Sequence, residues 1–352
     1  IALHATNYLA EQLKCNRYYG AKCLKQTIAN SGMWDIDEIT ECDEETSQII
    51  SERLLGQVFA VSAQIVEEEI CSIEDVDRGA KVGLRWAEGP FEIANKIGIK
   101  DAKEMAKKYA ELAGFELPLW IEEKEGLFDF NYIDTKIDDD VAKIVLNRPE
   151  AMNALNEEVV RQLGTVLDDL NSREEISTIV LEGAGKAFVA GADVKYFVDK
   201  IREDSIKDIY DFTSHGHEVL NKLEKSQKTT IALTTGLALG GGLELALSCD
   251  YRIGTRRSQF RFPETSIGIF PGLGGTQRTP RICGIEASRF AILAGNFLDS
   301  KVASALGIIT HLVDTAAINE TVVKLSKVGK PQNKYPSQPK DIDHPISKFA
   351  VE

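Results

Sequence analysis

The hydrophobic pattern of this chain changes once, near residues 116–130, and this change constrains the fold more than any other feature. Before it, apolar residues recur at the three- and four-residue spacing of helices, as in 50–66, and no segment alternates as a strand would. After it, short runs rich in β-branched residues alternate with helical stretches. The sequence therefore predicts an all-helical domain followed by a mixed domain with a covered sheet, an α+β and α/β combination.

In the helical part, capping and helix-breaking residues predict where single helices begin and end. Ser72 opens "SIED", which fits a capping box at a helix N-terminus. The glycines and proline of "GLRWAEGP" (83–90) interrupt that helix. A further helix is expected to begin at Asp101 and to stop at Gly114.

In the second part, two strands are expected to flank an acidic turn at Asp138–Asp140. The runs "ISTIVLEGAG" (176–185) and "TTIALTTG" (229–236) suit buried strands, and helical stretches at 156–171 and 214–226 lie near them. Strands that alternate with helices indicate an α/β architecture.

Composition excludes several functional classes. The formal net charge of −14 argues against a general nucleic-acid-binding protein, so an anionic ligand would need a local cationic or backbone-amide site. No apolar run approaches the roughly 18–20 residues that span a bilayer, so no membrane association is expected. The six cysteines are scattered without a CxxC pair, which favours reduced intracellular thiols over a disulfide framework or a zinc site.

Two segments place small residues between an expected strand and an expected helix. They are Ala190-Gly191-Ala192 in "GKAFVAGADVKYF" and Gly240-Gly241-Gly242 in "ALGGGLELALSCD". Small residues let a ligand approach main-chain N–H groups, and one amide from each segment could bind a single developing oxyanion. Tight turns without a ligand explain either segment equally well.

Two acids accompany these glycines. Glu244 follows the triplet, and Glu264 stands twenty residues later in "FRFPETSIGIFPG". A water held between two carboxylates can lose a proton to one while the other protonates a substrate. Taken alone, Glu244 fits a helix N-terminal charge and Glu264 fits a solvated turn residue, and the spacing does not decide between these interpretations.

Other motifs carry weaker signals. "PGLGGTQR" (271–278) lacks the lysine of a phosphate-binding P-loop and is expected to be a structural turn. The chain has no GxGxxG fingerprint after a strand, so no NAD site is expected. Its histidines are not near other residues in the sequence that would suggest a metal site.

Four motifs together resemble the enoyl-CoA hydratase (crotonase) family, in the order and spacing of that family from about residue 128 to residue 314. They are "IVLNRPEAMNAL" (144–155), "KAFVAGADVK" (186–195), "GLALGGGLELALSCDYRI" (236–253) and "FRFPETSIGIFPGLGGTQRTPR" (260–281). The resemblance implies a crotonase-like ββα spiral domain that acts on an acyl-CoA thioester.

By this resemblance, the amides of Ala192 and Gly241 form an oxyanion hole for the thioester carbonyl, and Glu244 and Glu264 are the catalytic pair. Because both acids are present, the resemblance favours syn hydration of a trans-2-enoyl-CoA to a 3-hydroxyacyl-CoA. An enoyl-CoA isomerase and a non-catalytic acyl-CoA-binding fragment are the alternatives. The resemblance also implies substrate and CoA contacts from Ala151, Lys186, Ala190, Gly191, Ala192, Asp193, Val194, Lys195 and Gly240.

The helical part resembles the C-terminal domain of 3-hydroxyacyl-CoA dehydrogenases over residues 50–98, and residues 1–35 resemble the tail of a preceding copy. This order is that of bifunctional dehydrogenase/hydratase fusions. No Rossmann domain is present, and Glu52-Arg53 stands where that family often has Asn-Arg, so dehydrogenase activity is not expected from this chain.

The expected domains are a helical tail (1–45), a helical domain (46–118), a linker (119–127) and a crotonase-like domain (128–352) that lacks some C-terminal helices of the family. The resemblance further implies a trimer-based homo-oligomer. It implies no cofactor beyond the CoA of the substrate. The expected location is the cytoplasm.

Overall fold

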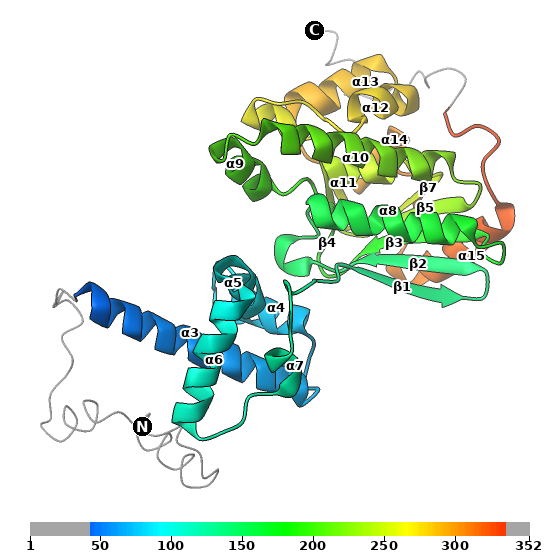
Figure 1. Cartoon of the computed structure of the whole chain (residues 1–352). Helices are drawn as coiled ribbons and strands as arrows, with labels where there is room; N and C mark the ends of the chain where they lie inside the picture. Colours follow the sequence, from blue (N-terminus) through cyan, green and yellow to red (C-terminus); the bar gives the residue numbers. More distant parts are fainter. Residues whose placement is uncertain (1–42, 336–352) are drawn as a thin grey trace, which may run out of the picture. The chain divides into compact units, whose positions relative to one another are not determined.

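The computed structural model describes residues 43–335 and divides the chain into two compact units, with the boundary after Phe130 (Figure 1). Each unit has its own hydrophobic core. The expected helical tail at 1–45 falls almost entirely outside the described residues.

The first unit is all-helical, as the periodicity predicted. Its helices are α3 (Glu44–Glu67), α4 (Ile73–Gly83), α5 (Pro90–Ile97), α6 (Ile99–Ala113) and α7 (Leu119–Glu122). Small buried residues bring α3 and α6 close together: a Cβ added at Gly56 would lie 2.4 Å from the Met105 carbonyl oxygen. The core of this unit is built around Phe59, Phe91 and the alanine stripe of α6.

The caps of these helices agree with the sequence except at one position. Ser72 is the N-cap of α4, and its side chain accepts a hydrogen bond from the Asp75 N–H at 3.3 Å. Gly114 ends α6 in the left-handed region at φ 75°. The predicted start of α6 at Asp101 is wrong, because the helix begins at Ile99 and Asp101 lies in its first turn, where a negative charge favours the helix dipole.

The expected linker at 119–127 is only partly a linker. It contains α7, whose Ile121 is buried in the core of the helical unit. Directly after it, Phe128 is fixed by Asn95, whose side chain donates to the Phe128 carbonyl at 2.9 Å and accepts from the Phe128 N–H at 2.7 Å. The apolar residues of this segment bury surface against Phe91, so the helical unit continues to Phe130.

Helix α3 also corrects the expectation that no segment is long and apolar enough for a bilayer. Within the described residues it is the one helix that meets this test by length and composition, with a mean hydropathy of 1.3 over its most apolar window. The core helix of a folded domain passes the same test, and α3 contributes Phe59, Ala60 and Ala63 to the buried core. The expectation of no membrane association stays a prediction.

The second unit contains two sheets. The strands are β1 (Ile133–Asp138), β2 (Val141–Leu146), β3 (Thr178–Gly183), β4 (Ala187–Ala190), β5 (Thr229–Thr234), β6 (Leu237–Leu239), β7 (Tyr251–Gly254), β8 (Gln259–Arg261), β9 (Leu298–Asp299) and β10 (His311–Leu312). The six-stranded sheet has the order β1-β2-β3-β5-β7-β10, and the four-stranded sheet has the order β4-β6-β8-β9. The predicted acidic hairpin is confirmed, with Asp139 in the left-handed region at its tip.

Among its described residues, the second unit also contains eight α-helices. They are α8 (Glu157–Ser172), α9 (Val194–Arg202), α10 (Ile206–Lys225), α11 (Gly241–Leu247), α12 (Gly275–Cys283), α13 (Ile285–Arg289), α14 (Ser300–Ala305) and α15 (Ile318–Val328). Short 3-10 turns occur at η2 (Pro149–Ala151), η3 (Glu264–Ile267) and η5 (Thr315–Ala317), and a π-helical turn, η4, spans Phe290–Ala294.

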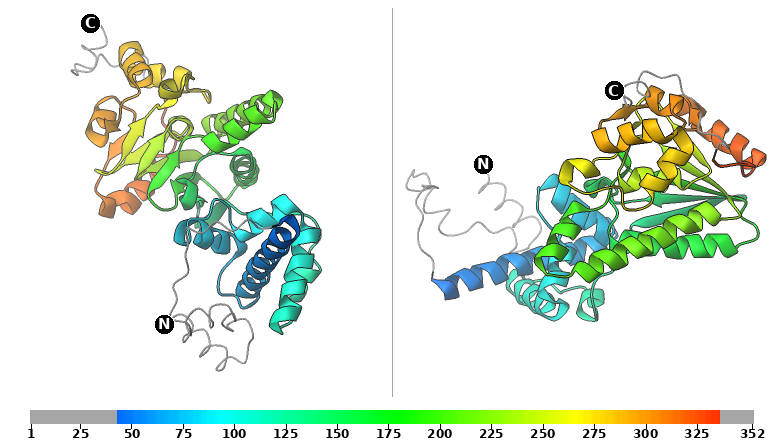
Figure 2. Two further views of the ribbon diagram at one scale, coloured as in Figure 1. Left: turned by 90° about the vertical axis from the view of Figure 1, so that its left-hand side faces the viewer. Right: turned by 90° about the horizontal axis from the view of Figure 1, so that it is seen from above.

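The successive strand pairs β3–β4, β5–β6 and β7–β8 each place one strand in the six-stranded sheet and the next in the four-stranded sheet, and helices or a 3-10 turn follow. This repeat is the expected ββα spiral. Helices α8 and α10 lie side by side (Figures 1 and 2).

The central strands of the six-stranded sheet are buried on both faces, which explains their continuous apolar runs. On β3, Ile179 and Leu181 belong to the main core, whereas Val180 faces a second cluster that includes Leu325 of α15. The two layers fix the carboxyl ends of β4 and β6, and the loops that leave these ends carry the glycine-rich segments.

Candidate active site

The three glycines that follow β6, Gly240 before α11 and Gly241 and Gly242 in its first turn, each meet a different neighbour. Gly240 has φ 45°, and a Cβ added there would lie 2.5 Å from Oε1 of Glu264. A Cβ at Gly242 would lie 2.1 Å from the carbonyl oxygen of Val189, because α11 packs directly on β4. Gly240 and Gly242 are therefore required by backbone conformation and close packing.

Gly241 lies beside Ala192. It is the first residue of α11, so its N–H has no acceptor within the helix. A Cβ added at Gly241 would make only ordinary contacts, among them the Ala192 nitrogen at 3.7 Å. The structure thus brings together the two residues that the resemblance assigned to an oxyanion hole.

The parallel bridge between Leu155 and Ala192 does not use the N–H group of Ala192. The Leu155 N–H donates to the Gly191 carbonyl at 2.9 Å, and the Asp193 N–H donates to the Leu155 carbonyl at 2.8 Å. These two bonds fix the residues on either side of Ala192. In the part of the chain that the structure describes, neither the Ala192 nor the Gly241 N–H has an acceptor, so two donors are available for one ligand oxygen.

Glu244 is buried in the first turn of α11, with 1% of its surface exposed. Its Oε1 accepts hydrogen bonds from the N–H groups of Gly275 at 2.6 Å and Leu273 at 2.8 Å. Burial, with a smaller contribution from the charge of Glu264, raises the pKa of Glu244 to about 7, although the two N–H groups oppose the shift. Oε2 has no hydrogen-bond partner among the described residues, so it can receive a water.

Glu264 opens η3 and is buried, although the sequence allowed a solvated turn residue. Its Oε2 is buried without a hydrogen-bond partner in the described part of the molecule. Burial raises its pKa above the ordinary value. Both acids contact Gly240, since the Glu244 N–H donates to the Gly240 carbonyl at 3.0 Å and Glu264 lies against the Gly240 Cα.

The predicted turn at 271–278 contributes more than a change of direction. It supplies the Leu273 and Gly275 N–H groups to Glu244, and Arg278 behind it donates to the Leu273 carbonyl at 2.8 Å. Sequence reasoning missed this role of the turn. An arginine three residues after a glycine pair is a weak signal, because an arginine after a turn can equally well lie on the surface.

The residues expected to contact CoA lie around the same loops. Ala190 and Gly191 lead from β4 to Ala192, and the Ala190 N–H donates to the Met152 carbonyl at 3.0 Å, which places the segment after Ala151 beside them. Lys186 is exposed in the turn between β3 and β4.

Asp193 and the residues after it differ in their surroundings. The Asp193 carboxylate forms an ion pair with Arg148 at 2.8 Å, so this side chain fixes the loop from inside the protein. Val194 is exposed at the start of α9, and Lys195 is the second residue of that helix. A contact of these residues with CoA stays a prediction.

Asn153 also supports the site and was missed. It is fully buried at φ 58°, and its side chain donates to the carbonyls of Ala184 and Ala187, both at 2.9 Å. Its Oδ1 accepts from the Arg148 N–H at 2.9 Å. The available signal was an Asn, a residue type that tolerates the left-handed region, within "PEAMNAL".

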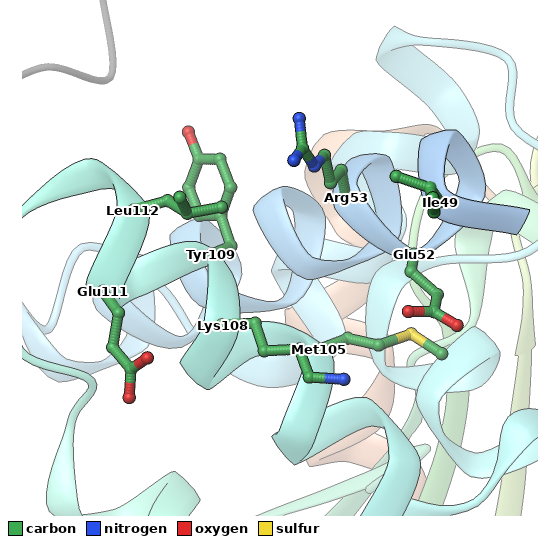
Figure 3. A pocket seen from close by; sticks show the side chains of 8 residues that line it. All are labelled: Ile49, Glu52, Arg53, Met105, Lys108, Tyr109, Glu111 and Leu112. Atoms are coloured by element: carbon green, nitrogen blue, oxygen red, sulfur yellow. The ribbon is translucent and has the colours of Figure 1, made fainter. Parts of the chain in front are cut away.

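A groove in the helical unit is the other candidate. It has a volume of about 410 Å³ and lies between α3 and α6, with Glu52 and Arg53 on one side and Lys108 and Tyr109 on the other (Figure 3). Glu52 accepts a hydrogen bond from Gln48 at 3.0 Å on its own helix. Charged side chains of both signs rim an exposed groove here, and they form none of the buried, convergent geometry seen around Glu244.

Comparisons with known proteins identify the family of each part of the chain. The Enoyl-CoA hydratase/isomerase family matches residues 141–351. The chain belongs to that family. The C-terminal domain of 3-hydroxyacyl-CoA dehydrogenase matches residues 49–136, so the helical unit is of this type and precedes the hydratase/isomerase domain.

Individual relatives are similar to about half of the chain. The chain is 34% identical over 187 residues to the short-chain-enoyl-CoA hydratase of Clostridium acetobutylicum, covering 53% of this chain and 70% of that protein. It is also 34% identical over 197 residues to the fatty acid oxidation complex subunit alpha of Shewanella frigidimarina, covering 55% of this chain and 27% of that one.

A solved structure has the same fold. The crystal structure of enoyl-CoA hydratase from Thermoplasma volcanium aligns with a TM-score of 0.53 at 32% identity. The alignment covers 57% of this chain and 78% of that one.

Proposed function

We propose that this chain is an enoyl-CoA hydratase that adds water to a trans-2-enoyl-CoA and forms a 3-hydroxyacyl-CoA. The observation that carries the proposal is the pair of buried acids, Glu244 and Glu264, which lie close enough for the charge of one to act on the other, beside the unused amide of Gly241. Hydratase relatives such as that of Clostridium acetobutylicum support the same reaction.

The thioester carbonyl oxygen would lie between the N–H groups of Ala192 and Gly241. As negative charge develops on this oxygen in the enolate-like transition state, both donors and the N-terminal dipole of α11 stabilise it. Because these donors are fixed by the Leu155 contact and by the start of the helix, they need no reorganisation during the reaction.

Each of the two acids then carries out one proton transfer. Glu244, with Oε1 held by two N–H groups, binds the attacking water through Oε2 and takes its proton as the water oxygen bonds to C3. Glu264, whose raised pKa favours the protonated form, gives its proton to C2. The product gains one OH and one H on the same face, and a proton exchange between the acids through water restores both.

The proposal extends to substrate and partners. The main-chain segment Ala190–Ala192 would contact the CoA part of the substrate, together with the side chains of Lys186 and Lys195. Four further residues would border the bound CoA: Ala151, Asp193, Val194 and Gly240. Hydration is redox-neutral and uses an acid, a base and oxyanion donors, so no cofactor beyond the CoA of the substrate is needed. We also propose that the chain forms a trimer-based homo-oligomer. We propose a cytoplasmic location because the buried Cys249 and Cys283 are free thiols.

An isomerase is the second candidate, since the family name covers both activities. Isomerisation moves a proton between carbons and needs no activated water, so one acid suffices. Two N–H groups donate to one oxygen of Glu244, and its other oxygen has no partner among the described residues. This arrangement favours the reaction in which Glu244 activates a water.

The deciding experiment follows the loss of enoyl-thioester absorbance with purified protein and crotonyl-CoA. Glu244→Gln and Glu264→Gln are compared with Glu218→Gln, an exposed glutamate on α10. Turnover by the parent and the control that collapses in both site variants supports the hydratase. If the folded parent does not turn over crotonyl-CoA, or if one site variant keeps its rate, the two-acid hydration proposal fails.

A further inference from the structure

The position of Glu244 depends on the turn Leu273–Gly275. Two N–H groups of this turn donate to the same oxygen, Oε1, at 2.8 and 2.6 Å. A small displacement of the turn would break these bonds and let the carboxylate rotate. Whatever holds the turn therefore sets the geometry of the candidate base.

Arg278 holds the turn from behind. Its guanidinium is almost fully buried, and Nη1 donates to the Leu273 carbonyl at 2.8 Å. The group also packs against Gly274: a Cβ added there would lie 2.2 Å from Nη1, and Gly274 has φ 101°. The turn therefore needs a glycine at its centre, and the guanidinium packs directly against that glycine.

Glu224 fixes Arg278 in turn. This glutamate lies in the last turn of α10. Its Oε2 accepts a hydrogen bond from Nε of Arg278 at 2.9 Å and lies 2.7 Å from Nη2 in the same ion pair. Its other oxygen accepts a hydrogen bond from the Tyr335 hydroxyl. Two guanidinium nitrogens facing one carboxylate oxygen fix the direction of the planar group, which a lysine could not reproduce.

We propose that Arg278, oriented by Glu224, is a positioning residue that holds the Leu273–Gly275 turn and thereby keeps Glu244 in its water-binding geometry. This assignment rests on the proposed hydratase function. Arg278 does not contact Glu244 directly by a hydrogen bond; it acts through the carbonyl of Leu273, whose own N–H is one of the two donors.

The assignment predicts a change in titration as well as in rate. The charged groups that act on Glu244 are Glu264 from η3 and Arg278 from α12. If the turn is released, the carboxylate loses two N–H donors and a nearby positive charge. Each loss disfavours the ionised form, so the pKa of Glu244 rises above its value of about 7.

The test uses variants that separate positioning from stability. The double variant Glu224→Gln/Arg278→Met removes both charges, so that no unpaired ion remains buried. Arg278→Lys keeps the charge but loses the two-point geometry. Arg289→Met is the control, because Arg289 forms an ordinary exposed pair with Glu286 on α13. Folding is checked by near-ultraviolet circular dichroism.

Two measurements are made on each folded protein. The first is the titration midpoint of the Glu244 carboxyl carbon, followed by NMR of protein labelled at glutamate and assigned with Glu244→Gln. The second is the pH dependence of kcat and KM with crotonyl-CoA. The NMR measurement does not need turnover, so it tests the assignment even if the parent fails as a hydratase.

We expect the midpoint of Glu244 to rise by about one pH unit in the double variant and by less in Arg278→Lys. At neutral pH, kcat should fall at least about 10-fold, a part of the effect of one general base, while KM stays within about twofold. The control should match the parent in every measurement.

An unchanged Glu244 midpoint and an unchanged kcat profile in the folded double variant would overturn the assignment, because a purely structural pair would change only the folded fraction. If the double variant does not fold, Arg278→Lys decides by the same criterion. A midpoint that moves downward in either variant also overturns it.

Discussion

Oε1 of Glu264 lies against the Cα of Gly240, where an added Cβ would be only 2.5 Å away. One residue later, Gly241 opens α11 with an unused N–H, and four residues after Gly240 the same helix carries Glu244. The glycine triplet thus joins both acids and one oxyanion donor in a single rigid unit. Predictions about the triplet can therefore separate packing from chemistry.

Gly241→Ala is expected to fold and to lose activity. The added methyl group meets Leu273, Leu155 and the Ala192 nitrogen only at ordinary contact distances, between 3.4 and 3.7 Å. It would, however, occupy the space beside the Ala192 N–H. We expect kcat with crotonyl-CoA to fall by roughly 100-fold, the usual effect of losing one oxyanion donor. Steady-state kinetics and a urea unfolding curve check both parts.

Gly242→Ala is the matched comparison for this prediction, since its methyl group would lie 2.1 Å from the Val189 carbonyl oxygen. It should lower the free energy of unfolding markedly. Equal stability of the two variants would contradict the division of roles within the triplet.

The pH dependence of kcat should report Glu244. As the base, it works in the ionised form, and burial raises its pKa to about 7. Activity should therefore increase with pH up to about neutrality, well above the usual range of glutamate, and then decline as Glu264 loses the proton that it gives to C2. Rates measured between pH 5 and 9 at saturating crotonyl-CoA check this. The residual activity of Glu244→Gln should lack this rising limb; a limb retained in that variant would assign the titration to another group.

How far the sequence could predict this molecule depended on the range of the interactions. Periodicity identified the helical unit, the acidic hairpin and the covered strands because each follows from neighbours in the chain. The N-cap at Ser72 was correct for the same reason, whereas the start of α6 was misplaced by two residues because Gly98 supplies a local backbone conformation that side-chain patterns do not show.

The site was predictable only in part. The four family motifs pointed to Glu244, Glu264, Ala192 and Gly241, and the structure brings these residues together. The support behind them was not visible in the sequence. Arg278 reaches Glu224 across 54 positions in the chain, and no local pattern specifies such a pair.

Glu244→Gln is expected to increase stability at alkaline pH. The pKa of Glu244 is raised from 4.5 to about 7 on folding, so its contribution to stability is fully present below pH 4.5 and is lost as pH rises through about 7. Above that range the ionised acid destabilises the fold by about 3 kcal/mol, which a neutral glutamine avoids.

Urea unfolding at pH 5 and pH 8.5 measures this difference. The variant should exceed the parent at pH 8.5, and the gap should shrink at pH 5. The exposed Glu218→Gln serves as the control and should show neither effect. A gap of the same size at both pH values would contradict the raised pKa.

Asn153→Asp should destabilise the protein although the two side chains have the same shape. The Asn153 amide donates to three carbonyls, those of Ala184, Ala187 and Phe188, which hold β4 and the segment leading to Ala192. An aspartate would place a buried negative charge against these oxygens, and we expect a loss of about 3 kcal/mol in the free energy of unfolding at pH 7. Asn156→Asp is the matched control, because Asn156 caps α8 by accepting from the Val159 N–H at 2.9 Å, a role that aspartate fills equally well. Urea unfolding of both variants should separate them clearly, and an equally small effect in each would show that the Asn153 amide does not secure the loop that positions the Ala192 N–H.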